Sequence, residues 1–149
     1  QVNAFKKKIT LVNEMNSSVE VYADRKMVET ILRNLISNAI KYTPAGGEVS
    51  ISAEKNDEKI EISVTDTGVG ISPKQIATLF RIDEHQNGTG PDKEMGTGIG
   101  LILCKEFVNK NSGKIWVESR MGEGSKFIFS LPVIKVENNW RTTKLDKTF

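Results

Sequence analysis

The sequence predicts an α+β fold, a two-layer sandwich in which three helices cover a mixed, mostly antiparallel sheet. Three observations carry this prediction: apolar alternation typical of strands comes in pairs, polar turns join the members of each pair, and helical patterns stand between the pairs. The chain of 149 residues is long enough for one domain with its own core, which we expect to cover residues 1–132.

The N-terminal part predicts two strands and a long helix. Apolar alternation at 8–13 and 18–23 indicates strands, and the polar residues between them predict an N-terminal strand hairpin, whose first part we assign to residues 1–18. Asp24 can cap the following helix, because its carboxylate accepts the free N–H groups of a first turn. Apolar residues then recur on one helical face from residue 25 to 42, until a proline and two glycines end the pattern.

The rest of the chain predicts two more hairpins and two more helices. Their strands are expected at 48–54, 59–65, 114–119 and 125–131. Ser72 before Pro73 is typical of a helix start, so a short helix should reach about residue 80, and a third should run from Gly98 to about residue 111. Residues 133–149 are polar and are expected to form a tail or linker.

Composition excludes several classes of function. The net charge of +2 is too small to indicate nucleic acid or an anionic membrane surface as a partner. The single cysteine, Cys104, rules out an internal disulfide and fits a reducing compartment, so we expect a cytoplasmic location. No apolar run is long enough to span a membrane, but the chain starts at Gln1 and is expected to be a piece of a longer protein, which could itself be membrane-anchored.

Residues 94–103 (EMGTGIGLIL) carry glycine at alternate positions, followed by an apolar run that opens the third helix. Gly96, Gly98 and Gly100 leave the backbone N–H groups of a turn free to point at one spot, and the helix aims its positive end at the same spot. This pattern favours an anion such as a phosphate chain. A flexible glycine-rich surface loop is the alternative that this stretch alone leaves open.

Four polar residues share one edge of the predicted long helix. Asn34, Asn38, Lys41 and Tyr42 lie at roughly 0°, 40°, −20° and 80° around its axis. Asparagine in mid-helix is mildly unfavourable for the helix itself. A carboxamide oxygen is a neutral hard ligand that suits Mg²⁺, and a lysine ammonium can meet phosphate as a point charge. An ordinary solvated helix face is the alternative.

Residues 66–71 (DTGVGI) interrupt the strand pattern where the fourth predicted strand stops. Asp66 would be partly buried there and would need a hydrogen-bond donor. Gly68 and Gly70 would let a flat ligand lie close to the backbone. A carboxylate can accept from the exocyclic amine of adenine, whereas guanine offers a carbonyl at that position. A strand-end aspartate in a plain glycine turn is the alternative.

Four stretches resemble the ATP-binding boxes of bacterial sensor histidine kinases. Residues 34–42 (NLISNAIKY) resemble the asparagine box, 66–71 the first glycine box, 79–83 (LFRID) the phenylalanine box and 96–101 (GTGIGL) the second glycine box. The boxes stand in the order of the family with its ordinary spacing, and the resemblance covers residues 19–132. Each box alone is a weak match, but the ordered set is specific for the catalytic and ATP-binding domain of such a kinase.

The resemblance implies the histidine-kinase ATPase fold, which gyrase, mismatch-repair and heat-shock chaperone proteins share, with ATP and Mg²⁺ as ligands. By matched position, Asp66 would bind the adenine amine, Asn38 would coordinate Mg²⁺, and residues 80–97 would form a mobile lid over ATP. Catalytic roles are implied for Asn34, Lys41 and Arg81. The implied nucleotide-binding set also includes Tyr42, Gly68, Gly70, Ile71, Gly96, Thr97, Gly98, Ile99, Gly100, Leu101 and Ser125.

The chain departs from the family pattern because nothing in it matches the phosphoacceptor histidine. The single histidine, His85, falls in the expected lid, where a solvated loop residue is the simplest interpretation. The resemblance therefore implies a domain that transfers the γ-phosphoryl group of ATP to a histidine on a separate dimerisation domain. A response-regulator receiver domain is the implied downstream partner.

Two other functions stay open. An ATP-hydrolysing clamp of the gyrase, mismatch-repair or chaperone type would use a glutamate base one turn before Asn38, where this chain has Asn34. A non-catalytic nucleotide-binding module would keep the fold and regulate a partner without chemistry, although the intact boxes argue against it.

Overall fold

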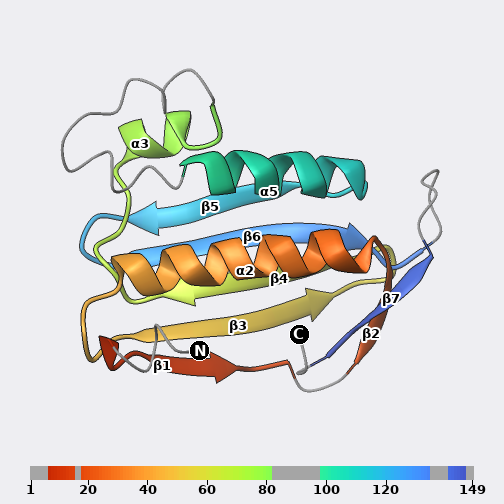
Figure 1. Cartoon of the computed structure of the whole chain (residues 1–149), viewed down its shortest axis with the longest axis horizontal. Coiled ribbons are helices and arrows are strands. Elements are labelled where there is room, and N and C mark those ends of the chain that lie inside the picture. The colour runs from red at the N-terminus through yellow and green to blue at the C-terminus, as the bar shows by residue number, and fades with distance from the viewer. Residues whose placement is uncertain (1–6, 16–17, 82–97, 135–140, 147–149) are drawn as a thin grey trace.

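The computed structural model describes residues 7–15, 18–81, 98–134 and 141–146 of the chain. In chain order the elements are β1 (Thr10–Asn13), β2 (Val19–Tyr22), α2 (Arg25–Tyr42), β3 (Glu48–Lys55), β4 (Lys59–Asp66), α3 (Pro73–Thr78), α5 (Gly98–Lys110), β5 (Ile115–Arg120), β6 (Gly124–Pro132) and β7 (Thr142–Leu145) (Figure 1). The predicted long helix is found with its expected bounds, and the third predicted helix begins at Gly98 as expected.

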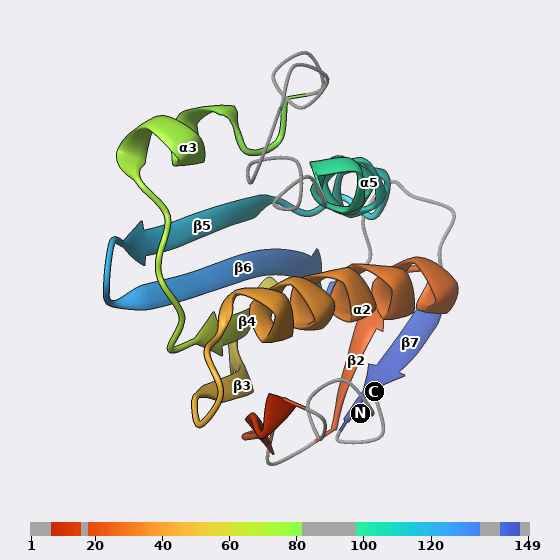
Figure 2. The same ribbon diagram turned by 60° about the vertical axis from the view of Figure 1, so that its left-hand side comes forward.

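A five-stranded sheet in the order β1-β3-β4-β6-β5 forms one layer of the molecule. β1 and β3 run parallel, whereas the other neighbouring pairs are antiparallel. The helices α2, α3 and α5 lie on the same side of this sheet (Figures 1 and 2). The predicted two-layer α+β sandwich with a mixed, mostly antiparallel sheet is therefore confirmed.

The core lies between α2, α5 and the inner face of the sheet. α2 buries the stripe that its sequence predicts: Val28, Leu32, Leu35 and Ala39 are each no more than 5% exposed. Alternate residues of β4 and β6 face this stripe, namely Ile60, Ile62, Val64, Phe127, Phe129 and Leu131. Because Asp66 continues the same alternation on β4, its side chain lies on the helix side of the sheet.

Two helix starts form as the sequence predicts. The side chain of Asp24 accepts a hydrogen bond from the Met27 N–H group at 2.9 Å and so caps α2. Ser72 and Gln75 form a reciprocal capping box at the start of α3, which ends at Thr78, slightly before the predicted position. None of the helices in the described ranges is both long and apolar enough to cross a membrane.

The predicted N-terminal hairpin is wrong, although both of its strands exist. β1 pairs in parallel with β3, and β2 pairs instead with β7 in a separate two-stranded sheet. The reason is that apolar alternation specifies a strand and its buried face but does not specify the neighbouring strand. The Glu14 N–H group also donates to the Ile51 carbonyl at 2.7 Å, which continues the β1–β3 pairing beyond β1 itself.

The expectation of a plain tail after Pro132 does not hold for residues 142–145, which form β7. Leu145 is 1% exposed, and the Thr143 hydroxyl donates to the Ala23 carbonyl at 2.7 Å, just before α2 begins. A segment with only one large apolar side chain among four residues gives too weak a pattern to predict a strand. Its pairing with β2, more than a hundred residues away in sequence, is what makes it part of the fold.

Candidate functional site

Asp66 stands at the end of β4 and is buried, with 6% of its surface exposed. Its Oδ1 atom accepts hydrogen bonds from the backbone N–H groups of Gly68, at 2.8 Å, and Ser125, at 3.2 Å. Among the described residues, no hydrogen bond reaches Oδ2. Desolvation raises the pKa of this carboxyl above its ordinary value of 3.8, and the two backbone hydrogen bonds partly oppose that shift.

The first glycine box interlocks with the turn between β5 and β6. Gly124 has φ +88°, and a Cβ atom on it would meet the Asp66 carbonyl oxygen. Gly70 has φ +77°, and a Cβ atom there would meet the carbonyl oxygen of Arg120. The Gly122 N–H group donates to the Val69 carbonyl at 2.8 Å. The two loops approach so closely that only glycine fits at Gly70 and Gly124.

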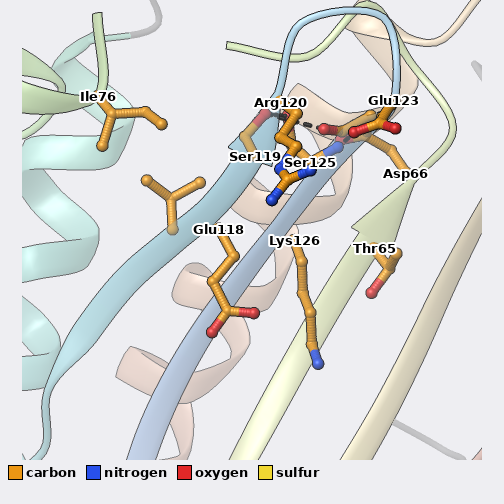
Figure 3. A pocket seen from close by; sticks show the side chains of 11 residues that line it. Thr65, Asp66, Ile76, Glu118, Ser119, Arg120, Glu123, Ser125 and Lys126 are labelled. Atoms are coloured by element: carbon orange, nitrogen blue, oxygen red, sulfur yellow. Dashed lines mark hydrogen bonds between the residues drawn. The ribbon is translucent and has the colours of Figure 1, made fainter. Parts of the chain in front are cut away.

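A cavity of about 510 Å³, within the usual range for ligand pockets, opens beside Asp66 (Figure 3). Ser119 on β5 and Ser125 on β6 lie next to the carboxylate, and Ile76 of α3 lines the same cavity. The cavity is also lined by Thr65, Glu118 and Lys126, which strand alternation places on the face of the sheet away from Asp66. Of the described residues that line it, none comes from α2, so this cavity covers only the Asp66 side of the predicted site.

The last turn of α2 adjoins the first glycine box through backbone contacts. The Val69 N–H group donates to the Tyr42 carbonyl at 3.4 Å, and a Cβ atom on Gly68 would meet that same carbonyl. The Lys7 ammonium donates to the carbonyl groups of Ile40 and Lys41, at 3.1 and 2.7 Å. Both carbonyls lie in the last turn of the helix, and that of Ile40 also accepts from the Thr43 N–H group at 3.4 Å. The lysine therefore adds hydrogen bonds to the turn that carries Lys41 and Tyr42.

The polar edge of α2 is found as predicted, with unequal exposure along it. Asn38 is buried at 6% exposed, Asn34 and Tyr42 are half-buried, and Lys41 is exposed. The Lys41 Nζ atom lies 5.7 Å from the centre of the Tyr42 ring. The edge therefore runs from a buried carboxamide to an exposed cation, ending beside the Asp66 loop.

α5 runs antiparallel to α2 and meets it at Asn34. A Cβ atom on Gly100 would lie 3.3 Å from the Asn34 Oδ1 atom, so the glycine permits this close approach. The Cys104 thiol donates to the Ile31 carbonyl at 3.7 Å. Burial raises the pKa of Cys104 to about 12, against the lowering effect of a side-chain hydrogen bond with Asn34, so the thiol stays protonated at neutral pH.

The remaining predicted residues divide into two groups. Gly96, Thr97, His85 and all of the expected lid after Arg81 lie outside the described residues, as does the side chain of Ile99. Gly98 opens α5, Leu101 lies in the core at 4% exposed, Ile71 is 9% exposed, and Arg81 is exposed just after α3. The structure thus brings the asparagine box, the first glycine box and the start of α5 to one end of the domain.

Comparison with known proteins agrees with this arrangement. Residues 23–135 match the family described as histidine kinase-, DNA gyrase B-, and HSP90-like ATPase. The chain belongs to this family. The histidine protein kinase DivJ of Caulobacter vibrioides is 44% identical over 116 residues, which are 78% of this chain and 19% of DivJ. The adaptive-response sensory kinase SasA of a Synechocystis strain is 35% identical over 137 residues, which are 91% of this chain and 35% of SasA.

Solved structures place this ATPase-family chain among histidine kinase catalytic domains. The nucleotide-free catalytic domain of the histidine kinase ThkA is 31% identical, with a TM-score of 0.71 over 88% of this chain and 84% of that one. Full-length ShkA in complex with AMPPNP gives a TM-score of 0.74 at 28% identity, over 88% of this chain and 27% of ShkA. The chain therefore corresponds to the catalytic domain of histidine kinases and spans about a fifth to a third of the curated relatives.

The residues at the asparagine box fit a Mg²⁺ ion bound together with nucleotide. The described residues contain no cluster of three or more His, Cys, Asp or Glu side chains that could hold a metal alone. Asn38, which the sequence predicts as the Mg²⁺ ligand, is buried and carries one neutral carboxamide oxygen. Mg²⁺ commonly takes few protein ligands and completes its shell with water and substrate phosphates, so this donor set is compatible with it.

Sequence reasoning missed three residues that hold this ATPase-family site together. Ser119 contacts both loops around Asp66, Lys7 caps α2, and Asn111 joins α5 to the start of α2. A serine in a strand and a lysine in a basic run carry no distinctive signal. Asn111 follows the third helix and reads as an ordinary helix end, although its side chain accepts from the Asp24 N–H group at 2.7 Å.

Proposed function

We propose that this domain binds Mg²⁺-ATP and transfers the γ-phosphoryl group to a histidine of a separate dimerisation domain, from which a response-regulator receiver would take it. Nothing in the described part of the chain supplies a histidine. The nucleophile and its base would therefore come from the partner domain, and this domain would supply binding, orientation and charge neutralisation. ATP as substrate would place the domain in the cytoplasm.

One observation carries the proposal: the arrangement of the Asp66 carboxylate. Backbone N–H groups hold Oδ1 from two sides, so the orientation of the carboxylate is fixed before any ligand arrives. Oδ2 then remains as an acceptor beside the cavity. An adenine amine can donate to such an atom, whereas the guanine carbonyl at the same position would meet it acceptor to acceptor.

The other proposed roles follow the order of residues along α2. Asn38 would present its carboxamide oxygen to Mg²⁺, with Asn34 beside it. Lys41 and Arg81, both exposed, would approach the phosphates as cations. The N-terminal end of α5 would face the phosphate chain with its positive dipole end. When bound, Mg²⁺ would supply neutralisation of phosphate charge.

The test is an Asp66→Asn substitution with ATP and GTP titrations in Mg²⁺. Because Oδ1 is held by two N–H donors, the asparagine would turn its NH₂ group towards the ligand. A donor would then meet the adenine amine and would suit the guanine carbonyl. We expect ATP affinity to fall about 100-fold and the ATP-over-GTP preference to be lost or reversed. Unchanged ATP affinity in calorimetry would exclude Asp66 as the base reader.

Phosphotransfer separates this proposal from the alternatives. The domain alone, given ATP labelled at the γ-phosphate, should yield no phosphohistidine, and addition of the dimerisation domain of the parent protein should yield it. Steady ATP turnover by the domain alone would favour the clamp type of ATPase, and nucleotide binding without transfer would favour a regulatory module. The relatives and structural neighbours named above are histidine kinases, and position 34 is asparagine, so neither alternative is favoured.

A further inference from the structure

Ser119 joins the two loops that enclose Asp66. It lies on β5 directly opposite Ser125 of β6, which in turn lies opposite Asp66 of β4. Its hydroxyl oxygen is 2.8 Å from three groups: the N–H group of Ile71, the carbonyl of Gly124 and the hydroxyl of Ser125. One side chain therefore contacts the first glycine box, the β5–β6 turn and a neighbour of the carboxylate.

The direction of these three bonds follows from the chemistry of the groups. A hydroxyl has one proton and two acceptor sites. The Gly124 carbonyl can only accept, so the Ser119 proton goes there. The Ile71 N–H group can only donate, so it takes one acceptor site. The remaining contact must then be the Ser125 hydroxyl donating to Ser119.

This assignment leaves Ser119 with no free proton or acceptor site, while Ser125 has its proton committed. Ser125 lines the cavity beside Asp66, so its hydroxyl can offer only acceptor sites to a ligand. Figure 3 shows the two serines and the carboxylate gathered at one end of the sheet. Asp66 and Ser125 come from neighbouring strands and both line the cavity, so two acceptors there, Asp66 Oδ2 and Ser125 Oγ, would suit an NH₂ group and disfavour a carbonyl.

We propose that Ser119 is a positioning residue that sets purine selectivity by holding the Ser125 hydroxyl as an acceptor towards the cavity. The proposal rests on the nucleotide-binding function proposed above. Without the Ser119 hydroxyl, the Ser125 proton would lose its partner and could turn to the ligand as a donor. The same loss would leave the Ile71 N–H group unpaired.

The experiment measures ATP and GTP affinities for wild type, Ser119→Ala and Ser119→Thr. We expect Ser119→Ala to lower the ATP-to-GTP affinity ratio about tenfold, since one or two neutral hydrogen bonds change roles. Ser119→Thr keeps the hydroxyl on a residue suited to a strand and should restore most of the ratio. A wild-type ratio in Ser119→Ala would overturn the proposal.

Ser130→Ala is the matched control for stability. Ser130 is a buried serine in the same strand pair, whereas Ser119 is half-buried. The Ser130 hydroxyl accepts the Lys114 N–H group at 3.0 Å, far from Asp66 along β6. Ser130→Ala should lose this one hydrogen bond, fewer than the three of Ser119, and should leave the ATP-to-GTP affinity ratio unchanged. An equal change of ratio in both variants would show that Ser119 acts only through the general stability of the sheet, which overturns the proposal.

Binding of ATP analogues to the wild-type protein gives a second test, which does not depend on whether the variants fold. N6-methyl-ATP keeps one of the two N–H groups of the amine, and inosine triphosphate has a carbonyl in its place. We expect both to bind at least tenfold more weakly than ATP. If N6-methyl-ATP bound as tightly as ATP, the proposal that two acceptors receive the two N–H groups of the amine would be wrong. Failure of the wild type to prefer ATP over GTP would instead contradict the proposed function itself.

Discussion

The two sides of the candidate site are built by different means. Around Asp66, two loops are joined by backbone contacts that only glycine permits, and the carboxylate is held by backbone N–H groups. Between α2 and α5, the contacts are side chains reaching across two helices, with Asn34 at one end of the seam and Asn111 at the other. Backbone contacts fix one geometry, whereas side chains on packed helices can shift with their helix.

This difference would suit the two tasks that we propose for the site. Recognition of a purine edge requires acceptors that do not move. Selectivity arises because the wrong purine cannot form hydrogen bonds with acceptors held in fixed positions. Holding phosphates and Mg²⁺ requires groups that can follow a ligand whose own geometry changes during transfer. We therefore expect substitutions in the Asp66 loops to cause large losses of stability or selectivity, and substitutions in the helix seam to cause smaller losses.

The largest effect is expected for Gly124→Ala, which tests the backbone interlock. Its positive φ costs about 1–2 kcal/mol for an alanine, and its Cβ atom would also collide with the Asp66 carbonyl, so we expect a total loss of about 4 kcal/mol or more. Gly122→Ala is the matched control: it has a similar φ of +82° with open space around it. Urea unfolding of both variants would measure the difference, and equal losses would contradict the interlock.

The helix seam is tested by Asn111→Ala. Asn111 is fully buried, accepts from the Asp24 N–H group at 2.7 Å and donates to the Phe107 carbonyl at 2.7 Å. Its removal would leave the Asp24 amide without this partner, and we expect a loss of about 2–3 kcal/mol of unfolding free energy. ATP affinity of the folded fraction should change less than threefold. The exposed Asn109, changed to alanine on the same helix, should cost less than about 0.5 kcal/mol.

Residue patterns predicted most of the Asp66 side and less of the seam. The strand pattern placed Asp66 at the partly buried end of β4, and the first glycine box was recognised with Gly70 in it. The positive φ of Gly70 and Gly124, and the contact of each with the opposite loop, were not predicted. The asparagine box likewise stood on one edge of a helix that could be read from its apolar stripe. The four boxes together also indicated the family from the sequence.

Partners across long sequence separations could not be predicted. Ser119 has three hydrogen-bond partners only because β5, β6 and the first glycine box meet in the fold. β7 is a strand only because β2 is free to pair with it, and Leu145 is a core residue only as a consequence. Local sequence patterns indicate the buried face of a strand and the position of a turn. Which strand or side chain lies beside it is decided by tertiary packing.

Titration of Asp66 gives a smaller effect with a defined sign. Desolvation raises its folded pKa above the ordinary 3.8, so between these two values the folded state binds more protons than the unfolded state. Stability should therefore fall as pH rises through that window in the absence of nucleotide. Asp66→Asn should remove this part of the slope in urea unfolding measured at a series of pH values. Asp57→Asn, in the exposed β3–β4 turn, is the control, and parallel profiles for wild type and Asp66→Asn would contradict the prediction.

The smallest effect should be a gain, at the far end of the helix seam. Ser112 follows α5 with φ +61°, and the N–H groups of Ser112 and Gly113 donate to the carbonyls of Asn109 and Val108, at 3.1 and 3.0 Å. This bonding closes the helix in the motif that usually places glycine at the position of Ser112. Ser112→Gly should relieve the strain of a left-handed serine and raise stability by about 0.5–1 kcal/mol, seen as a higher urea midpoint with an unchanged slope. Because Asn111 precedes Ser112, a gain in stability with unchanged ATP affinity would show that this end of the seam can be stabilised without moving the Asp66 loops. A loss of stability would mean that the serine side chain stabilises the fold by more than its backbone strain destabilises it.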